Sequence, residues 1–163
     1  MDDFSLKAID QAIEESKYNI SNNYEKGGPF GAVIVKDGKI IASCHNTVVE
    51  SKDPTAHAEV NAIRKAGKVL KTHDLEGCIL YTSAEPCPMC LSAIIWANIK
   101  EVYYANTRKD ADEIGFRDDD IYEYLKGKNQ KFIKLHQIKD EDALEEALEV
   151  FEIFKETDER NMY

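Results

Sequence analysis

The chain has 163 residues, of which 43% are hydrophobic and 32% are charged, as in an ordinary globular protein, so we expect one domain over residues 1–163. Its net charge is −10, from 31 acidic and 21 basic side chains, which argues against a nucleic-acid partner because Lys and Arg supply most affinity for phosphate backbones. The acidic start is not expected to be a signal peptide, and no segment approaches the ~20 apolar residues that span a bilayer. We therefore expect a cytoplasmic protein that contacts no membrane.

The N-terminal part of the chain predicts a helix followed by a hairpin. Apolar residues recur near a helical period from Ile9 to Ile20, before a Gly-Gly-Pro break at residues 27–29. Two β-prone runs, residues 30–35 and 40–44, flank an Asp-Gly turn. This arrangement is typical of two antiparallel strands joined by a tight turn.

The middle of the chain alternates helices and strands. Asp53-Pro54-Thr55 marks a helix entry, and this helix is expected to continue to about Leu70. The apolar content of residues 78–82 and 101–105 predicts two strands. Between these strands, prolines open a helix expected over residues 86–96.

The C-terminal part predicts a further strand at Lys131–Leu135 and a helix over about residues 141–160. One face of that helix is apolar and consists of Leu144, Ala147, Leu148, Phe151 and Phe154. Its many acidic residues are expected on a solvated face. The order of elements favours an α/β fold, a three-layer α/β/α sandwich in which helices cover a mixed central sheet.

Two short segments carry the chemistry. His57-Ala58-Glu59 and Pro86-Cys87-Pro88-Met89-Cys90 together match H-x-E…P-C-x-x-C, the pattern of zinc nucleobase deaminases. A Cys-x-x-Cys at a helix start directs two sulfurs toward one point, where free backbone N–H groups favour thiolates. Residues His57, Cys87 and Cys90 would thus be three zinc ligands that leave a fourth position for water, as in catalytic rather than structural sites.

Glu59 follows the histidine by two residues and is expected to take a proton from the zinc-activated water and pass it to a leaving nitrogen. Zinc lowers the pKa of its water to about 7. Two alternatives remain at this point: a redox Cys-x-x-Cys pair, or a structural zinc held by four cysteines including Cys44 and Cys78. These two cysteines lie in apolar strands, so we expect them in the core, and we expect His73 and His136 at the surface.

Longer strings resemble the cytidine deaminase-like superfamily and, within it, the bacterial guanine deaminases. These strings are Gly28–Val35, Asp53–Glu59, Tyr81–Ser83 with Glu85–Cys90, Ile95–Ala97, Gly115–Phe116, Asp118 with Ile121–Tyr122, and the terminal Tyr163. The resemblance implies an enzyme with one Zn²⁺ per chain that hydrolyses a small purine base, guanine, to xanthine and ammonia. It also implies a homodimer in which the C-terminal helix is exchanged.

The resemblance assigns substrate-binding roles to five residues. Asn46 is expected to hydrogen-bond the purine edge, and Phe30 and Trp96 to sandwich the ring. Ala58 and Cys87 are placed beside the substrate, with the backbone N–H of Cys87 helping to hold the zinc-bound oxygen. On residue type alone, the two aromatic residues suit the core equally well, and the asparagine suits a turn.

Two more residues are catalytic by resemblance. Asp118 would accept a hydrogen bond from the guanine amino group and help to move a proton, and Tyr163 would reach into the site from the partner subunit. On type alone, the acidic run that begins at Asp118 would be solvated or would cap a helix. The adjacent Arg117 departs from the family pattern, and residues 126–140 show no similarity to it.

Three other functions are retained as alternatives. A tRNA adenosine deaminase or a cytosine deaminase would share all the zinc chemistry, and a basic stripe at Lys65, Lys68 and Lys71 would favour RNA. The segment Asp110–Asp118 lacks the basic run of the tRNA-acting relatives, which favours guanine. A scaffold subunit with structural zinc is the non-enzymatic alternative, and the presence of Glu59 counts against it.

Overall fold

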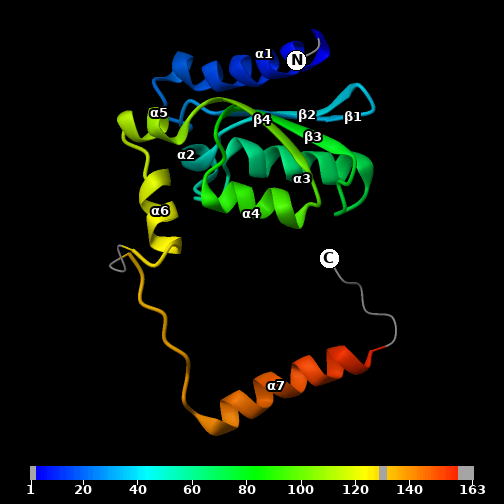
Figure 1. Cartoon of the computed structure of the whole chain (residues 1–163), viewed down its shortest axis with the longest axis vertical. Coiled ribbons are helices and arrows are strands. Elements are labelled where there is room, and N and C mark those ends of the chain that lie inside the picture. Colours follow the sequence, from blue (N-terminus) through cyan, green and yellow to red (C-terminus); the bar gives the residue numbers. More distant parts are fainter. Residues whose placement is uncertain (1–2, 129–131, 158–163) are drawn as a thin grey trace.

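The computed structural model describes residues 3–128 and 132–157 (Figure 1). In chain order its elements are α1 (Asp3–Lys17), the 3-10 helix η1 (Tyr18–Asn22), β1 (Gly31–Lys36), β2 (Lys39–His45), α2 (Val48–Ser51), α3 (Ala58–Leu70), β3 (Cys78–Ala84), α4 (Pro88–Trp96), β4 (Glu101–Asn106), α5 (Arg108–Glu113), α6 (Asp118–Leu125) and α7 (Glu141–Glu156). We call the part from α1 to α6 the body.

The sheet of the body is mixed, in the order β2-β1-β3-β4. Strand β1 is antiparallel to both β2 and β3, whereas β3 and β4 are parallel. The predicted hairpin is therefore confirmed, with Lys36 opposite Lys39 at the turn. The parallel pair requires a crossover connection, and α4 provides it between β3 and β4.

Helices cover both faces of this sheet (Figure 1). On one face, Ala8 and Ala12 of α1 are buried against Val33, Val35 and Tyr81. These alanines are four residues apart and so lie on the same side of the helix, and their small side chains let α1 pack close to the strands.

The alternate residues of β1 point the other way, because successive side chains of a strand face opposite sides. Ala32 and Ile34 of β1 pack with Ala62 of α3 and Ile94 of α4 in the larger core cluster. Helices α3 and α4 thus form the third layer. The expected three-layer α/β/α sandwich is confirmed.

Two boundaries differ from the sequence-based expectation. Helix α3 begins at Ala58, not at Asp53, because residues 53–57 form a turn in which the Asp53 carboxylate accepts from the backbone and side chain of Thr55. The predicted strand at Lys131–Leu135 is wrong for its described residues, since residues 132–135 have no strand structure and are exposed. These described residues pair with no strand of the sheet.

Helix α7 stands apart from the body (Figure 1). It ends at Glu156, so its described part is shorter than the expected helix, and residues 158–160 lie outside the described residues. None of the residues of α7 is buried. Among the helices that the structure describes, none is long and apolar enough to cross a membrane.

Candidate active site

Three predicted ligands converge at the start of two helices. The Nδ1 atom of His57 lies 3.6 Å from the Sγ atom of Cys87 and 3.5 Å from that of Cys90. Tetrahedral zinc with Zn–N and Zn–S bonds of about 2.05 and 2.3 Å would separate nitrogen and sulfur by about 3.6 Å. Within the described part of the chain, this is the group of His, Cys, Asp or Glu side chains with metal-binding geometry. The three residues fit one Zn²⁺ per chain.

The local backbone explains this convergence. His57 is the N-cap of α3 and Cys87 the N-cap of α4, each with an extended backbone (ψ of 156° and 167°). Neither side chain makes a capping hydrogen bond, which leaves the ring nitrogen and the sulfur available to a metal. Pro88 occupies the first turn of α4, where its missing N–H costs nothing. The positive ends of both helix dipoles favour thiolate at this point.

The electrostatics of the site call for a cation. A hydrogen bond from Cys90 lowers the pKa of the Cys87 thiol to about 4, although burial opposes this shift. The pKa of the Cys90 thiol is raised by its bond to Cys87, by burial and by the carboxylate of Glu59. The two thiols and the carboxyl group are close together and buried, so they cannot all be ionised at once without a nearby positive charge. A bound dication removes this conflict, since it favours the deprotonated form of every neighbour.

Glu59 lies in the same space. It is only 6% exposed, and burial is the main reason that the pKa of its carboxyl group is raised to about 7. The hydroxyl group of Thr82 on β3 donates to its Oε1 at 3.5 Å. The carboxyl group thus shares a small cleft with the ligands His57 and Cys87.

A larger hollow adjoins this cleft. Its volume is about 620 Å³, and it is lined by residues that include Gly27, Gly28, Asn46, His57 and Phe116. The volume lies within the usual range for small-molecule sites. Asn46, which follows β2 directly, is 3% exposed.

Two phenylalanines form one wall. Phe30 and Phe116 meet edge to face, with ring centroids 4.7 Å apart at 84°, and both line the cleft with Glu59. A Cβ at Gly28 would lie 2.9 Å from the Phe116 ring and 3.0 Å from the Phe30 ring, so glycine permits this packing. Phe116 was missed as a ring contact, although it belongs to the string that carries the family resemblance.

The structure does not bring Trp96 to this wall, so Phe30 and Trp96 of one chain do not face each other across the cleft. Helix α4 starts at the metal ligands and runs away from them, which puts its last residue about 9 Å along the axis beyond Cys90. There, Trp96 is 64% exposed and lines a different hollow, together with Ile63 and His73.

Asp118 does reach the cleft. It is the first residue of α6, and burial followed by the nearby Cys87 thiolate raises the pKa of its carboxyl group. The hydroxyl group of Tyr122, one turn further on, donates to the backbone oxygen of Pro86 at 2.8 Å. This bond ties α6 to the loop that carries Cys87, and sequence reasoning missed it because no spacing rule links residues 86 and 122.

The remaining expectations have mixed outcomes. The side chain of Ala58 packs into the core, so only its backbone N–H, which has no partner within the helix, is left for a substrate. Tyr163 lies outside the described residues. Cys78 is buried and Cys44 is half-buried against the core, as expected, and both are separate from the metal cluster.

The chain matches the family model of the cytidine and deoxycytidylate deaminase zinc-binding region over residues 4–106. Guanine deaminase from Bacillus subtilis is 55% identical over 130 residues, which are 79% of this chain and 81% of that protein. The X-ray structure of guanine deaminase from Bacillus subtilis superposes with a TM-score of 0.87 and 44% identity, over 100% of this chain and 99% of that one.

A tRNA-specific adenosine deaminase from Aquifex aeolicus is also similar. It is 52% identical over 95 residues, which are 58% of this chain and 60% of that protein. The likeness to this protein is therefore strong but spans less of the chain than the likeness to the guanine deaminase.

Proposed function

The chain belongs to the cytidine and deoxycytidylate deaminase zinc-binding family, and from this premise we propose that it hydrolyses guanine to xanthine and ammonia. The observation that carries the proposal is the likeness to a guanine deaminase along the whole chain, α7 included. The hollow beside the metal ligands supports it, because its apolar wall and single buried amide suit one purine ring. The small-molecule partner would be guanine itself.

In the proposed reaction, water adds to ring carbon C2, the bond from C2 to the amino nitrogen breaks, and ammonia leaves. His57, Cys87 and Cys90 would hold the zinc ion, which would supply the Lewis acidity that makes water nucleophilic at neutral pH. Glu59 takes a proton from that water and delivers it to the departing nitrogen. Its burial in the cleft keeps bulk water away from this proton.

The other residues of the cleft orient the ring. The Phe30 and Phe116 pair packs against it, while Asp118 accepts a hydrogen bond from the amino group and helps to move a proton toward it. The backbone N–H of Cys87 donates to the oxygen that adds at C2, and the backbone N–H of Ala58 faces the same space. Asn46 bonds the purine edge.

We also propose that residues 1–163 form one domain that pairs as a homodimer through exchange of α7. Helix α7 exposes Leu148 and Phe151, and α4 exposes Ile95 and Trp96, so each chain has an apolar helix face and an apolar surface on its body. Exchange would bring Tyr163 to the partner's site. The free thiols, which metal binding requires, support a cytoplasmic location.

The test is ammonia release by the zinc-loaded protein from guanine, guanosine, adenine, cytosine and a tRNA anticodon stem, measured side by side. We expect turnover of guanine and xanthine as its product. Turnover of the RNA alone would contradict guanine hydrolysis and identify a tRNA adenosine deaminase. Turnover of cytosine alone would identify a cytosine deaminase. No turnover at full zinc occupancy would favour the scaffold alternative.

A further inference from the structure

The amide group of Asn46 can present only one of its two ends to the hollow. Its Oδ1 atom accepts from the backbone N–H of Gly28 at 3.3 Å and from that of Val48 at 3.1 Å. A flipped amide would place its NH₂ group against two N–H donors, so these bonds dictate the orientation. The side chain therefore offers N–H donors to the hollow that it lines.

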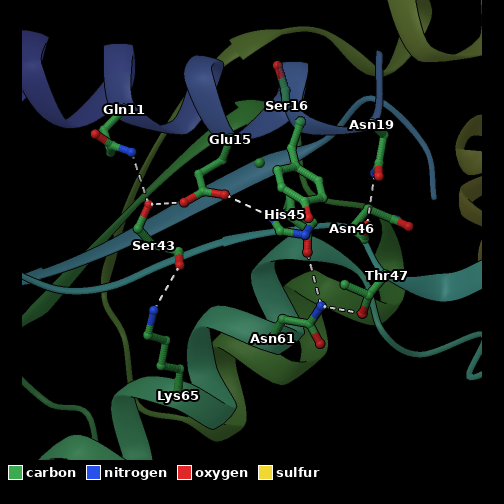
Figure 2. A network of polar contacts seen from close by, with 12 residues as sticks. Gln11, Glu15, Ser16, Asn19, Ser43, His45, Asn46, Thr47, Asn61 and Lys65 are labelled. Atoms are coloured by element: carbon green, nitrogen blue, oxygen red, sulfur yellow. Dashed lines mark hydrogen bonds and ion pairs between the residues drawn. The ribbon is translucent and has the colours of Figure 1, made fainter. Parts of the chain in front are cut away.

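A second, fully buried asparagine holds this arrangement from the side of η1. The Nδ2 group of Asn19 donates to the backbone oxygen of Gly28 at 3.0 Å and to that of Asn46 at 2.9 Å. Asn19 is 0% exposed, and both of its amide hydrogens have acceptors. It thereby joins the peptide that follows Gly28 to the peptide that follows Asn46, and each of these is the neighbour of a peptide whose N–H orients the Asn46 amide. Figure 2 shows Asn19 above Asn46.

A third asparagine holds the same segment from the side of the metal. Asn61 lies on α3, four residues after His57, and its Nδ2 donates at 3.0 Å to both the backbone oxygen of His45 and the hydroxyl group of Thr47 (Figure 2). These are the residues immediately before and after Asn46. Asn61 thus fixes the distance between the helix that carries Glu59 and the amide at the substrate edge.

Close packing leaves this amide little freedom to adjust by itself. A Cβ at Gly27 would lie 2.4 Å from the backbone oxygen of Asn46 and 2.5 Å from its Oδ1. Side chains at real contacts do not approach so closely, so the Gly27 backbone packs directly against the amide. The amide therefore depends on the peptides around it for its position.

We propose that Asn19 and Asn61 are positioning residues that preset Asn46 as a pure hydrogen-bond donor, so that the site selects a ring with an acceptor at this edge. Neither residue is among those that line the hollow, so both act through Asn46. The inference rests on the proposed function and adds a selection rule to it: the group opposite Asn46 is a ring nitrogen or carbonyl oxygen, never an amino group. Guanine offers N3, N7 and O6 as such acceptors.

The test is a thermodynamic cycle between protein and ligand. Dissociation constants for guanine, 3-deazaguanine, 7-deazaguanine and 2-aminopurine are measured by calorimetry in a Glu59→Gln background, where the ligand is bound without turnover. Asn19→Asp is added because its side chain keeps the shape of asparagine but loses at least one of the two N–H donors that bind the backbone oxygens of Gly28 and Asn46. Asn61→Asp is the second variant, on a less buried residue. Asn22→Asp, on the same short helix as Asn19, is the matched control.

We expect Asn19→Asp and Asn61→Asp each to weaken guanine binding about tenfold, the upper range for one neutral hydrogen bond. One of the three analogues lacks the acceptor that faces Asn46. For this analogue, the dissociation constants of the two variants should equal that of their Glu59→Gln parent. The control should bind all four ligands as its parent does.

Equal weakening of all four ligands would mean a merely structural role and would overturn the inference, as would unchanged binding of guanine. Guanine hydrolysis by the wild-type protein is measured in parallel. If the wild-type protein does not hydrolyse guanine, both the proposed function and the inference are overturned. If it hydrolyses guanine but the variants do not lose affinity selectively for ligands with the acceptor, only the inference is overturned.

Discussion

The body and α7 both contain helices with apolar faces, but these faces are packed against the sheet in the body and exposed in α7. In the body, α1, α3 and α4 each bury apolar residues against the sheet, and this packing brings the ligands His57, Cys87 and Cys90 together beside Glu59. In α7, every residue is exposed, and Phe151 is 73% exposed. The metal ligands and Glu59 are thus assembled within one chain, whereas α7 has an apolar face that its own chain does not cover.

The difference shows where each region obtains its stability. A 16-residue helix is only marginally stable alone in water. Burial of Leu148 and Phe151 would each contribute about 1.5–3 kcal/mol relative to exposure. The body supplies its own packing, while α7 gains this energy only against another surface. Four predictions test the comparison.

The largest effect is expected in the body. Glu59→Gln should lower guanine turnover by about 10³-fold, within the range of one acid–base group, because the amide cannot carry the proton. Zinc content, measured by atomic absorption, should stay at one per chain. Glu50→Gln is the control, since Glu50 is exposed on α2 and should leave turnover unchanged. Near-normal turnover by the Glu59→Gln variant would contradict the assignment of proton transfer to Glu59.

The next effect concerns the end of the chain. Removal of residues 158–163, which include Tyr163, should lower turnover by about 10²-fold through loss of substrate positioning. The melting temperature and zinc content should not change, because the packed core lies in the body. Tyr163→Phe separates the hydroxyl group from the ring. Full activity of the truncated protein would show that the body alone forms the complete site.

A smaller effect is expected from the face of α7. Leu148→Asp should dissociate the proposed dimer, as measured by sedimentation, and lower turnover at low protein concentration, since a charge cannot be buried in the proposed interface without a partner charge. In a protein whose α7 stays in solvent, the same change would alter stability by about 0.5 kcal/mol or less. Glu149→Gln on the same helix is the control. A monomeric wild-type protein would contradict the proposed exchange.

The smallest effect is expected at the join between α6 and the metal loop. Tyr122→Phe loses the 2.8 Å bond to Pro86 and should lower kcat about threefold to tenfold, the range for one buried hydrogen bond. KM for guanine should change less, because Tyr122 acts through Asp118 and Cys87. The control is Tyr124→Phe on the same helix. An equal loss in the control would place the effect in general packing of α6.

These regions also differ in what their sequence revealed. The ligands His57, Cys87 and Cys90 were predictable because each lies at a helix start, where local spacing determines geometry. The hairpin was predictable from its turn for the same reason. Asn19 and Asn61 gave no signal, since each acts on backbone oxygens 9 to 27 positions away along the chain.

Expectation and structure differ where three-dimensional direction matters. Trp96 belongs to the string that carries the family resemblance, yet the axis of α4 takes it away from Phe30. The strand expected at Lys131–Leu135 had a suitable sequence but no neighbouring strand. Sequence patterns report what a segment can form, and whether it does so depends on the surfaces within reach.

Zinc titration of the metal-depleted protein tests guanine hydrolysis at this site most directly. Xanthine formation from guanine is followed as zinc is added, with conversion of adenosine to inosine in a tRNA anticodon stem followed in parallel. We predict that xanthine formation rises with zinc, saturates at one equivalent per chain and proceeds without inosine. Inosine in the RNA, with guanine unchanged at full zinc occupancy, would contradict guanine as the substrate.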